Sequence, residues 1–126
     1  MHSVTSNAVS RAMSYSTDEV NTGKKWIDGK TIYRKVLTAT LQTNEEVLTL
    51  TVSHQIKSLV SVKGLLSKGN VDLVIPYCFI DGSTVYQIYT YSDRSNLFII
   101  PRSSDGTYFT AGCVVRVIVE YTKTTD

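Results

Sequence analysis

A tight β-hairpin is predicted by Trp26-Ile27-Asp28-Gly29-Lys30-Thr31-Ile32-Tyr33, where an Asp-Gly pair stands between β-branched and aromatic residues. A two-residue turn that follows the right-handed twist of its strands needs positive φ at both central positions, and Asp followed by Gly supplies them readily. Such a turn would place Ile27 opposite Lys30, Trp26 opposite Thr31 and Lys25 opposite Ile32. We expect a tether before this hairpin and more sheet after it.

Alternating polar and apolar residues predict two half-buried strands next in the chain. In residues 31–41 one face carries Tyr33, Leu37, Ala39 and Leu41, and the other carries Arg34, Thr38 and Thr40. A polar turn at Asn44-Glu45-Glu46 then leads to residues 47–52, where Leu48, Leu50 and Val52 should face inward and Thr49 and Thr51 outward.

Glycine and proline divide the middle of the chain. Residues 56–66 are expected to break at Lys63-Gly64 and to stop at Lys68-Gly69-Asn70, and residues 71–80 to be interrupted by Pro76. A second Asp-Gly turn, in Ile80-Asp81-Gly82-Ser83, predicts a hairpin that pairs Phe79 with Thr84 and Tyr77 with Tyr86. The strand that it feeds, residues 85–91, has aromatic residues on both faces.

The last predicted strand, residues 113–121, is apolar on both faces, which indicates a central strand. One face carries Cys113, Val115, Val117, Val119 and Tyr121. Short strands at spacings of about ten residues, separated by turns, are typical of an antiparallel sandwich or barrel. We therefore expect an all-β fold, an antiparallel β-sandwich of the jelly-roll kind with six to eight strands, and a short N-terminal helix.

The N-terminal residues carry a narrow apolar stripe of Val4, Ala8 and Ala12 at helical spacing, within residues 3–13. A helix this short is unstable alone, so its partner would come from another copy of the chain, as in a homotrimer with a parallel helical bundle. The alternative is a frayed chain end. Residues 14–23 are expected to be a linker. The predicted organisation is a helical tether and linker over residues 1–22 and a β-sandwich tip over residues 23–126.

Composition argues against several partners. The net charge is only +2 and the basic residues are scattered, so nucleic-acid binding is not expected. No apolar run approaches the length of a membrane span, and residues 1–15 lack the apolar core of a signal peptide. Cys78 and Cys113 are expected to be buried free thiols, and a disulfide stays open if their strands prove adjacent.

No catalytic or metal-binding motif is present, so we expect no enzyme and no cofactor. Asp28, Asp81 and Asp105 are each explained by an Asp-Gly turn, and Glu45 and Glu46 by a polar turn. His2 and His54 have no metal-like spacing with the two cysteines. Binding or structure is favoured over catalysis.

Four runs of sequence resemble the C-terminal module of bacteriophage tail-fibre, appendage and other structural proteins. They are His2-Ser3-Val4-Thr5-Ser6-Asn7-Ala8-Val9, Tyr15-Ser16-Thr17, Trp26-Ile27-Asp28-Gly29-Lys30-Thr31-Ile32-Tyr33-Arg34-Lys35 and Val119-Glu120-Tyr121-Thr122-Lys123-Thr124-Thr125-Asp126. The resemblance implies a virion component assembled in the host cytoplasm, commonly trimeric, whose β-rich tip faces the host surface. It also implies that a segment like residues 4–12 connects to other virion proteins.

Three functions follow as hypotheses. The first is a receptor-binding tip that recognises host-surface carbohydrate through exposed aromatic rings, with Tyr86, Tyr89, Tyr91 and Tyr108 as candidate residues. The alternative for these tyrosines is packing in the core or between subunits. The second is a head-fibre or capsid-decorating module without receptor binding, which a flat apolar face between subunits would favour. The third and least favoured is a glycan-degrading tip, which would need two carboxylates facing each other in a groove.

Overall fold

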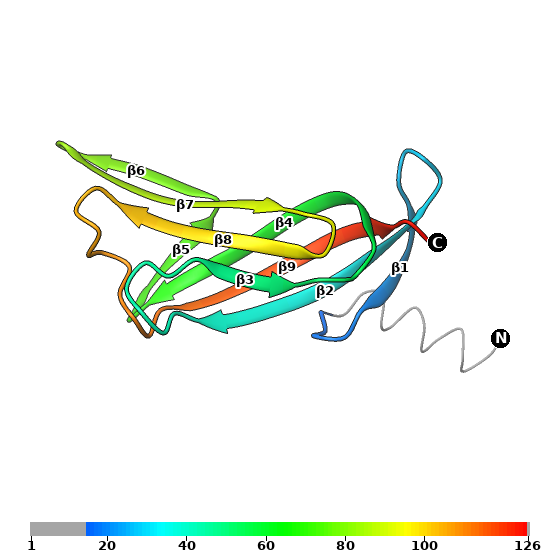
Figure 1. Cartoon of the computed structure of the whole chain (residues 1–126), viewed down its shortest axis with the longest axis horizontal. Coiled ribbons are helices and arrows are strands. Elements are labelled where there is room, and N and C mark those ends of the chain that lie inside the picture. Colours follow the sequence, from blue (N-terminus) through cyan, green and yellow to red (C-terminus); the bar gives the residue numbers. More distant parts are fainter. Residues whose placement is uncertain (1–14, 126) are drawn as a thin grey trace.

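Two antiparallel sheets pack face to face as a β-sandwich in the computed structural model, which describes residues 15–125 (Figure 1). One sheet has five strands in the order β1-β2-β9-β4-β5, and the other has four in the order β3-β8-β7-β6. The predicted N-terminal helix, with Val4, Ala8 and Ala12, lies outside the described residues. Between residues 15 and 125, no helix has the length and apolarity to cross a membrane.

The described part of the chain contains nine strands rather than the six to eight expected. They are β1 (Val20–Lys25), β2 (Thr31–Thr40), β3 (Leu48–Thr51), β4 (Ile56–Lys68), β5 (Val71–Ile75), β6 (Tyr77–Asp81), β7 (Thr84–Ser92), β8 (Asn96–Ser103) and β9 (Val114–Lys123). The interruption expected at Pro76 is a change of sheet: β5 lies in the five-stranded sheet and β6 in the four-stranded sheet. Proline has no N–H for a β-ladder, so the run divides there.

The predicted strand faces are confirmed. Strand β9 lies between β2 and β4, and its apolar face is fully buried at Val115, Val117, Val119 and Tyr121. Leu48 and Val52 are buried while Thr49 and Thr51 are exposed. These inward faces meet Ile88, Leu97 and Ile99 of the other sheet in a single apolar core.

The first hairpin has a three-residue turn, so the predicted register is wrong by one residue. Lys25 pairs with Thr31 instead of Ile32, and the Lys25 Nζ donates a hydrogen bond to the Thr31 hydroxyl at 2.9 Å. The Gly29 amide donates to the Trp26 carbonyl, and the Trp26 amide donates to the Lys30 carbonyl. Gly29 has φ of 85°, which fits a type I turn followed by a glycine bulge.

The second hairpin has the expected two-residue turn, but its central residues are Gly82 and Ser83 rather than Asp81 and Gly82. Gly82 has φ of 62°, whereas Ser83 does not adopt positive φ, which matches a type II′ turn with glycine first. Phe79 therefore pairs with Tyr86, and Tyr77 pairs with Ile88. A shift of two residues leaves each side chain on the face that was predicted.

Strand β4 continues through Lys63-Gly64, where a break was expected. Gly64 lies opposite Val117 of β9, and a Cβ on Gly64 would lie 2.5 Å from the Arg116 carbonyl oxygen and 2.5 Å from Val117 Cγ1. The glycine therefore allows close approach of two paired strands instead of ending one. The stop at 68–70 is confirmed, since β4 ends at Lys68.

Two smaller expectations also need correction. The residues expected to form a linker up to Gly23 include the start of β1, where Val20 and Thr22 are buried against β2. Cys78 was expected to be buried but is exposed on β6, while Cys113 is buried; both thiols are free.

Candidate functional site

The outer face of the four-stranded sheet presents two exposed tyrosine rings on β7. Alternation along this strand turns Ile88 into the core and Gln87, Tyr89 and Tyr91 outward. Tyr89 is 44% exposed and Tyr91 is 53% exposed. We refer to Gln87, Tyr89 and Tyr91, with their neighbours Phe98 and Arg102 on β8, as the tyrosine face.

Strand β8 supports these rings from the side. The Tyr91 and Phe98 rings stack with centroids 4.6 Å apart and planes 19° apart. Tyr89 lies opposite Ile100, and Gln87 lies opposite Arg102. The result is an aromatic surface at one end of the face and a polar surface at the other.

Two hollows flank Gln87. One, of ≈ 360 Å³, is lined by Pro76, Tyr77, Cys78, Gln87, Ile88 and Tyr89. The other, of ≈ 190 Å³, is lined by Val85, Gln87, Arg102, Ser103 and Ser104. Within residues 15–125, the Gln87 amide and the hydroxyls of Tyr89 and Tyr91 have no hydrogen-bond partner. They can therefore bind the hydroxyl groups of a ligand that lies over the rings.

The loop that follows β8 holds the polar end of the tyrosine face in place. The Arg102 guanidinium donates to the Glu45 carbonyl at 2.7 Å and to the Pro101 carbonyl at 2.8 Å. The Ser103 hydroxyl lies 2.7 Å from one Glu45 carboxylate oxygen and 3.0 Å from Asp105 Oδ1. These contacts make the smaller hollow a preformed feature of the fold.

Asp105 stabilises a turn, as the sequence predicted. Its carboxylate accepts a hydrogen bond from the Thr107 amide, and this bond together with the Ser103 and Thr107 hydroxyls lowers the pKa of the Asp105 carboxyl. Asp28 likewise accepts a hydrogen bond from the Lys30 amide. Asp81 differs, because it is the last residue of β6.

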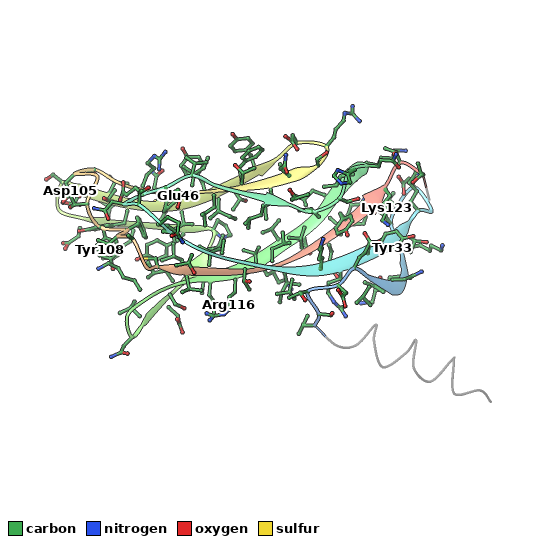
Figure 2. The ribbon with its side chains drawn as sticks, turned by 60° about the horizontal axis from the view of Figure 1, so that its bottom comes forward. Tyr33, Glu46, Asp105, Tyr108, Arg116 and Lys123 are labelled. Atoms are coloured by element: carbon green, nitrogen blue, oxygen red, sulfur yellow. The ribbon has the colours of Figure 1, made fainter. Side chains whose placement is uncertain are left out.

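The four predicted tyrosines divide between the two faces of the sheet. Tyr86 and Tyr108 lie on the inner side, packed against the core with ring centroids 4.8 Å apart, and Tyr108 also contacts the buried Phe109 ring at 4.9 Å. Figure 2 shows Tyr108 near Asp105 at the end of the sandwich away from Tyr33 and Lys123. Tyr86 and Tyr108 are therefore packing residues, as the alternative interpretation proposed, and only Tyr89 and Tyr91 share an exposed surface.

Three residues of the tyrosine face were missed from the sequence. Gln87 alternates with Tyr86 and Ile88, so its outward direction could have been found from the period of the strand. Phe98 and Arg102 join the face through the pairing of β7 with β8, which no local pattern in the sequence indicates.

Neither the arrangement of potential metal ligands nor comparison with other proteins identifies a ligand for this site. In the part of the chain that the structure describes, no group of three or more His, Cys, Asp or Glu residues is placed to hold a metal ion. Comparisons with protein-family models, with curated proteins and with solved structures found no match to this chain.

Proposed function

We propose that this chain is the tip module of a bacteriophage fibre, which forms a homotrimer in the virion and binds host-surface carbohydrate through the tyrosine face. The resemblance of its terminal runs to bacteriophage structural proteins supports the virion role. The observation that carries the binding role is the pair of exposed rings at Tyr89 and Tyr91 beside the Gln87 amide, which has no hydrogen-bond partner among residues 15–125.

The chemistry of the face suits a sugar. Aromatic rings cover the apolar faces of pyranose rings, and nearby amide, guanidinium and hydroxyl groups bind sugar hydroxyls. The polar end combines the Arg102 guanidinium with Ser103, which contacts the Glu45 and Asp105 carboxylates, so it offers both donors and acceptors to the hydroxyls of capsular or cell-wall polysaccharides. A shallow surface fits a polymer that is bound along its length better than a small enclosed ligand.

A binding screen tests this proposal. The full chain is applied to immobilised capsular and cell-wall polysaccharides beside its Tyr89→Ala, Tyr91→Ala and Ile27→Ala variants. Ile27 is 90% exposed on the first hairpin, away from the tyrosine face, so its variant is the control. We expect the two tyrosine variants to lose about tenfold or more in affinity and the control to bind like the parent chain. Binding that all variants retain equally would overturn the tyrosine face as the site.

The second candidate is a head-fibre or capsid-decorating module without receptor binding. It is favoured by the apolar outer face of the five-stranded sheet, where Val36, Leu65, Val74 and Ile118 line a hollow. A stable trimer that binds no bacterial polysaccharide would support this candidate. In both cases the stripe of Val4, Ala8 and Ala12 is proposed to form a short helix that joins the copies and continues toward other virion proteins.

A further inference from the structure

The tyrosine face continues onto the edge strand β6. Cys78 lies opposite Gln87 in the pairing of β6 with β7, and Ile80, two residues along the strand, faces the same side. Phe79, between them, turns to the inner side, where its ring stacks on the Tyr86 ring with centroids 6.2 Å apart. Cys78 is exposed, and Ile80 is 63% exposed. The outer face therefore has an apolar border on β6, directly beside Gln87.

Gln87 stands between two hollows of different chemistry. The hollow of ≈ 190 Å³ on the β8 side is lined by an arginine and two serines in addition to Gln87 and a valine. The hollow of ≈ 360 Å³ on the β6 side surrounds the same residue with a proline, an isoleucine, a cysteine and two tyrosines. A ligand group that binds Gln87 can therefore place an apolar end toward β6, while polar groups of the ligand face β8.

The chemistry of the Gln87 side chain indicates which group fits there. Its amide has one acceptor oxygen and two N–H donors, and within residues 15–125 it has no hydrogen-bond partner. An acetamido group on a sugar carries one N–H donor, one carbonyl acceptor and a methyl group. Gln87 can donate to that carbonyl and accept from that N–H, while the methyl group enters the apolar hollow. A hydroxyl in the same place would leave the apolar hollow unfilled.

Tyr89 connects this hollow to the exposed rings. It lines the hollow together with Pro76 and Cys78, and its side chain is 44% exposed on the outer face. One sugar unit can therefore cover the Tyr89 ring and reach Gln87 at once. We propose that the tyrosine face selects N-acetylated amino sugars, with the acetamido group held in the hollow between Gln87 and Cys78. This inference rests on the proposed function, because it names the class of sugar that the same face binds.

Two neutral tetrasaccharides test the selectivity. Chitotetraose and cellotetraose share the same linkage and the same ring, and they differ only in the acetamido group or hydroxyl on the second carbon of each sugar. The affinity of the full chain for each is measured by nuclear magnetic resonance titration. We expect chitotetraose to bind about tenfold or more tightly than cellotetraose, since it adds an apolar contact and a pair of amide hydrogen bonds.

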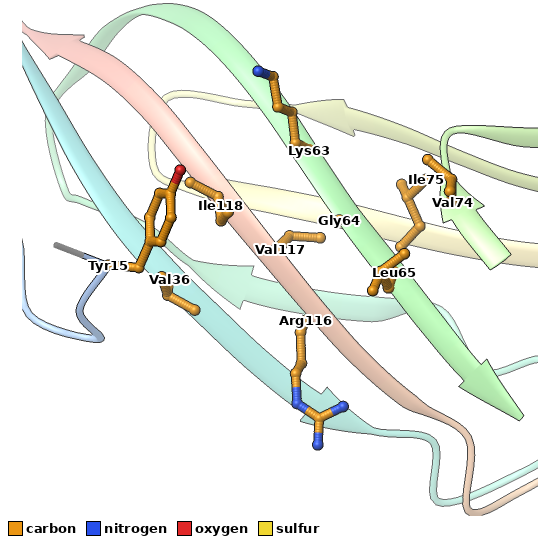
Figure 3. A pocket seen from close by; sticks show the side chains of 10 residues that line it. All are labelled: Tyr15, Val36, Lys63, Gly64, Leu65, Val74, Ile75, Arg116, Val117 and Ile118. Carbon is orange, nitrogen blue, oxygen red and sulfur yellow. The ribbon is translucent and has the colours of Figure 1, made fainter. Parts of the chain in front are cut away.

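Two variants locate the source of the selectivity. Gln87→Met keeps the length of the side chain and removes the amide, and Cys78→Phe fills the hollow; circular dichroism verifies their folds. We expect each variant to bring the two affinities to within about twofold of each other. Val74→Ala is the control. Val74 lines a hollow of ≈ 470 Å³ on the outer face of the five-stranded sheet, and among the described residues no side-chain amide lines it (Figure 3). The control should discriminate as the parent chain does.

The possible results separate this inference from the proposed function. Equal affinity of the parent chain for the two tetrasaccharides, with Tyr89→Ala weakening both, would overturn the selectivity and leave the tyrosine face supported. Discrimination that Gln87→Met and Cys78→Phe both retain would overturn the hollow as the acetamido site. A parent chain that binds neither tetrasaccharide would also overturn this inference, and the polysaccharide screen then decides the proposed function separately.

Discussion

The carboxylate of Glu45 accepts hydrogen bonds from both the amide and the hydroxyl of Ser103, at 3.1 and 2.7 Å. It also lies within reach of the Phe109 amide at 3.4 Å. One side chain therefore ties the turn before β3 to the loop after β8. The backbone of Glu45 has φ of 52°, a left-handed conformation that few residues with a side chain adopt. The turn at residues 44–46 is thus held by specific contacts with the loop after β8 and is not a generic polar loop.

Replacement of Glu45 should lower the stability of the domain. Hydrogen bonds to a charged group contribute about 1.5 to 3 kcal/mol each, so we expect Glu45→Ala to lower the free energy of unfolding by at least about 2 kcal/mol. The matched variant is Glu46→Ala, whose carboxylate accepts one exposed hydrogen bond from the Gln42 amide and should cost under about 1 kcal/mol. Urea unfolding measures both, and equal costs would show that the Glu45 contacts do not hold the loop.

Gly64 should tolerate no side chain. The nearest atoms to an added Cβ include backbone atoms of β9, which cannot move without disturbing the central strand. We expect Gly64→Ala to destabilise the domain by about 2 to 3 kcal/mol. Gly69→Ala is the control, because Gly69 has φ of 59° but open space around its Cα, so only about 1 kcal/mol of backbone strain applies. A Gly64 variant no less stable than the Gly69 variant would contradict the close approach of β4 and β9.

Tyr121 should make stability fall in alkaline solution. Burial raises the pKa of the Tyr121 hydroxyl well above its usual value near 10, and the hydrogen bond that it donates to Glu19 and the charge of Glu19 raise it further. Above about pH 10 the unfolded chain loses this proton whereas the folded chain keeps it, so the unfolded state binds fewer protons and stability falls as pH rises.

The Tyr121→Phe variant isolates this effect. The wild-type free energy of unfolding should decrease with a slope of up to about 1.4 kcal/mol per pH unit more than that of the variant. The variant should be less stable than wild type at neutral pH, because the hydroxyl bond to Glu19 is lost. Parallel pH profiles above pH 10 would show that Tyr121 ionises equally well in the folded state.

The inward faces of the strands were predictable because side chains alternate with a strict period of two. Leu48 and Val52, and likewise Val115 and Val117, follow this period and are buried. The turn registers were not predictable to the same degree. Gly29 and Gly82 both adopt positive φ, yet glycine can do so in a two-residue or a three-residue turn, and the pairing of the flanking strands decides which one forms.

The candidate site was predictable only in part, for a related reason. Residues 85–91 have aromatic side chains on both faces, so the period alone separates Tyr86 from Tyr89 without saying which is exposed. That depends on which face of β7 meets the five-stranded sheet. Gly64 shows the same limit, because a glycine that ends a strand and a glycine that lets two strands approach look alike in one sequence.

The most direct test of the tyrosine face is a nuclear magnetic resonance titration of the full chain, with its eight tyrosine rings labelled with carbon-13, against a polysaccharide identified in the binding screen. The exposed rings of Tyr89 and Tyr91 should shift on binding, while the Tyr121 ring, which is fully buried, and the Tyr33 ring beside it on the five-stranded sheet should not. Shifts that spare Tyr89 and Tyr91 and appear at other rings would contradict the proposal that this face binds the host surface.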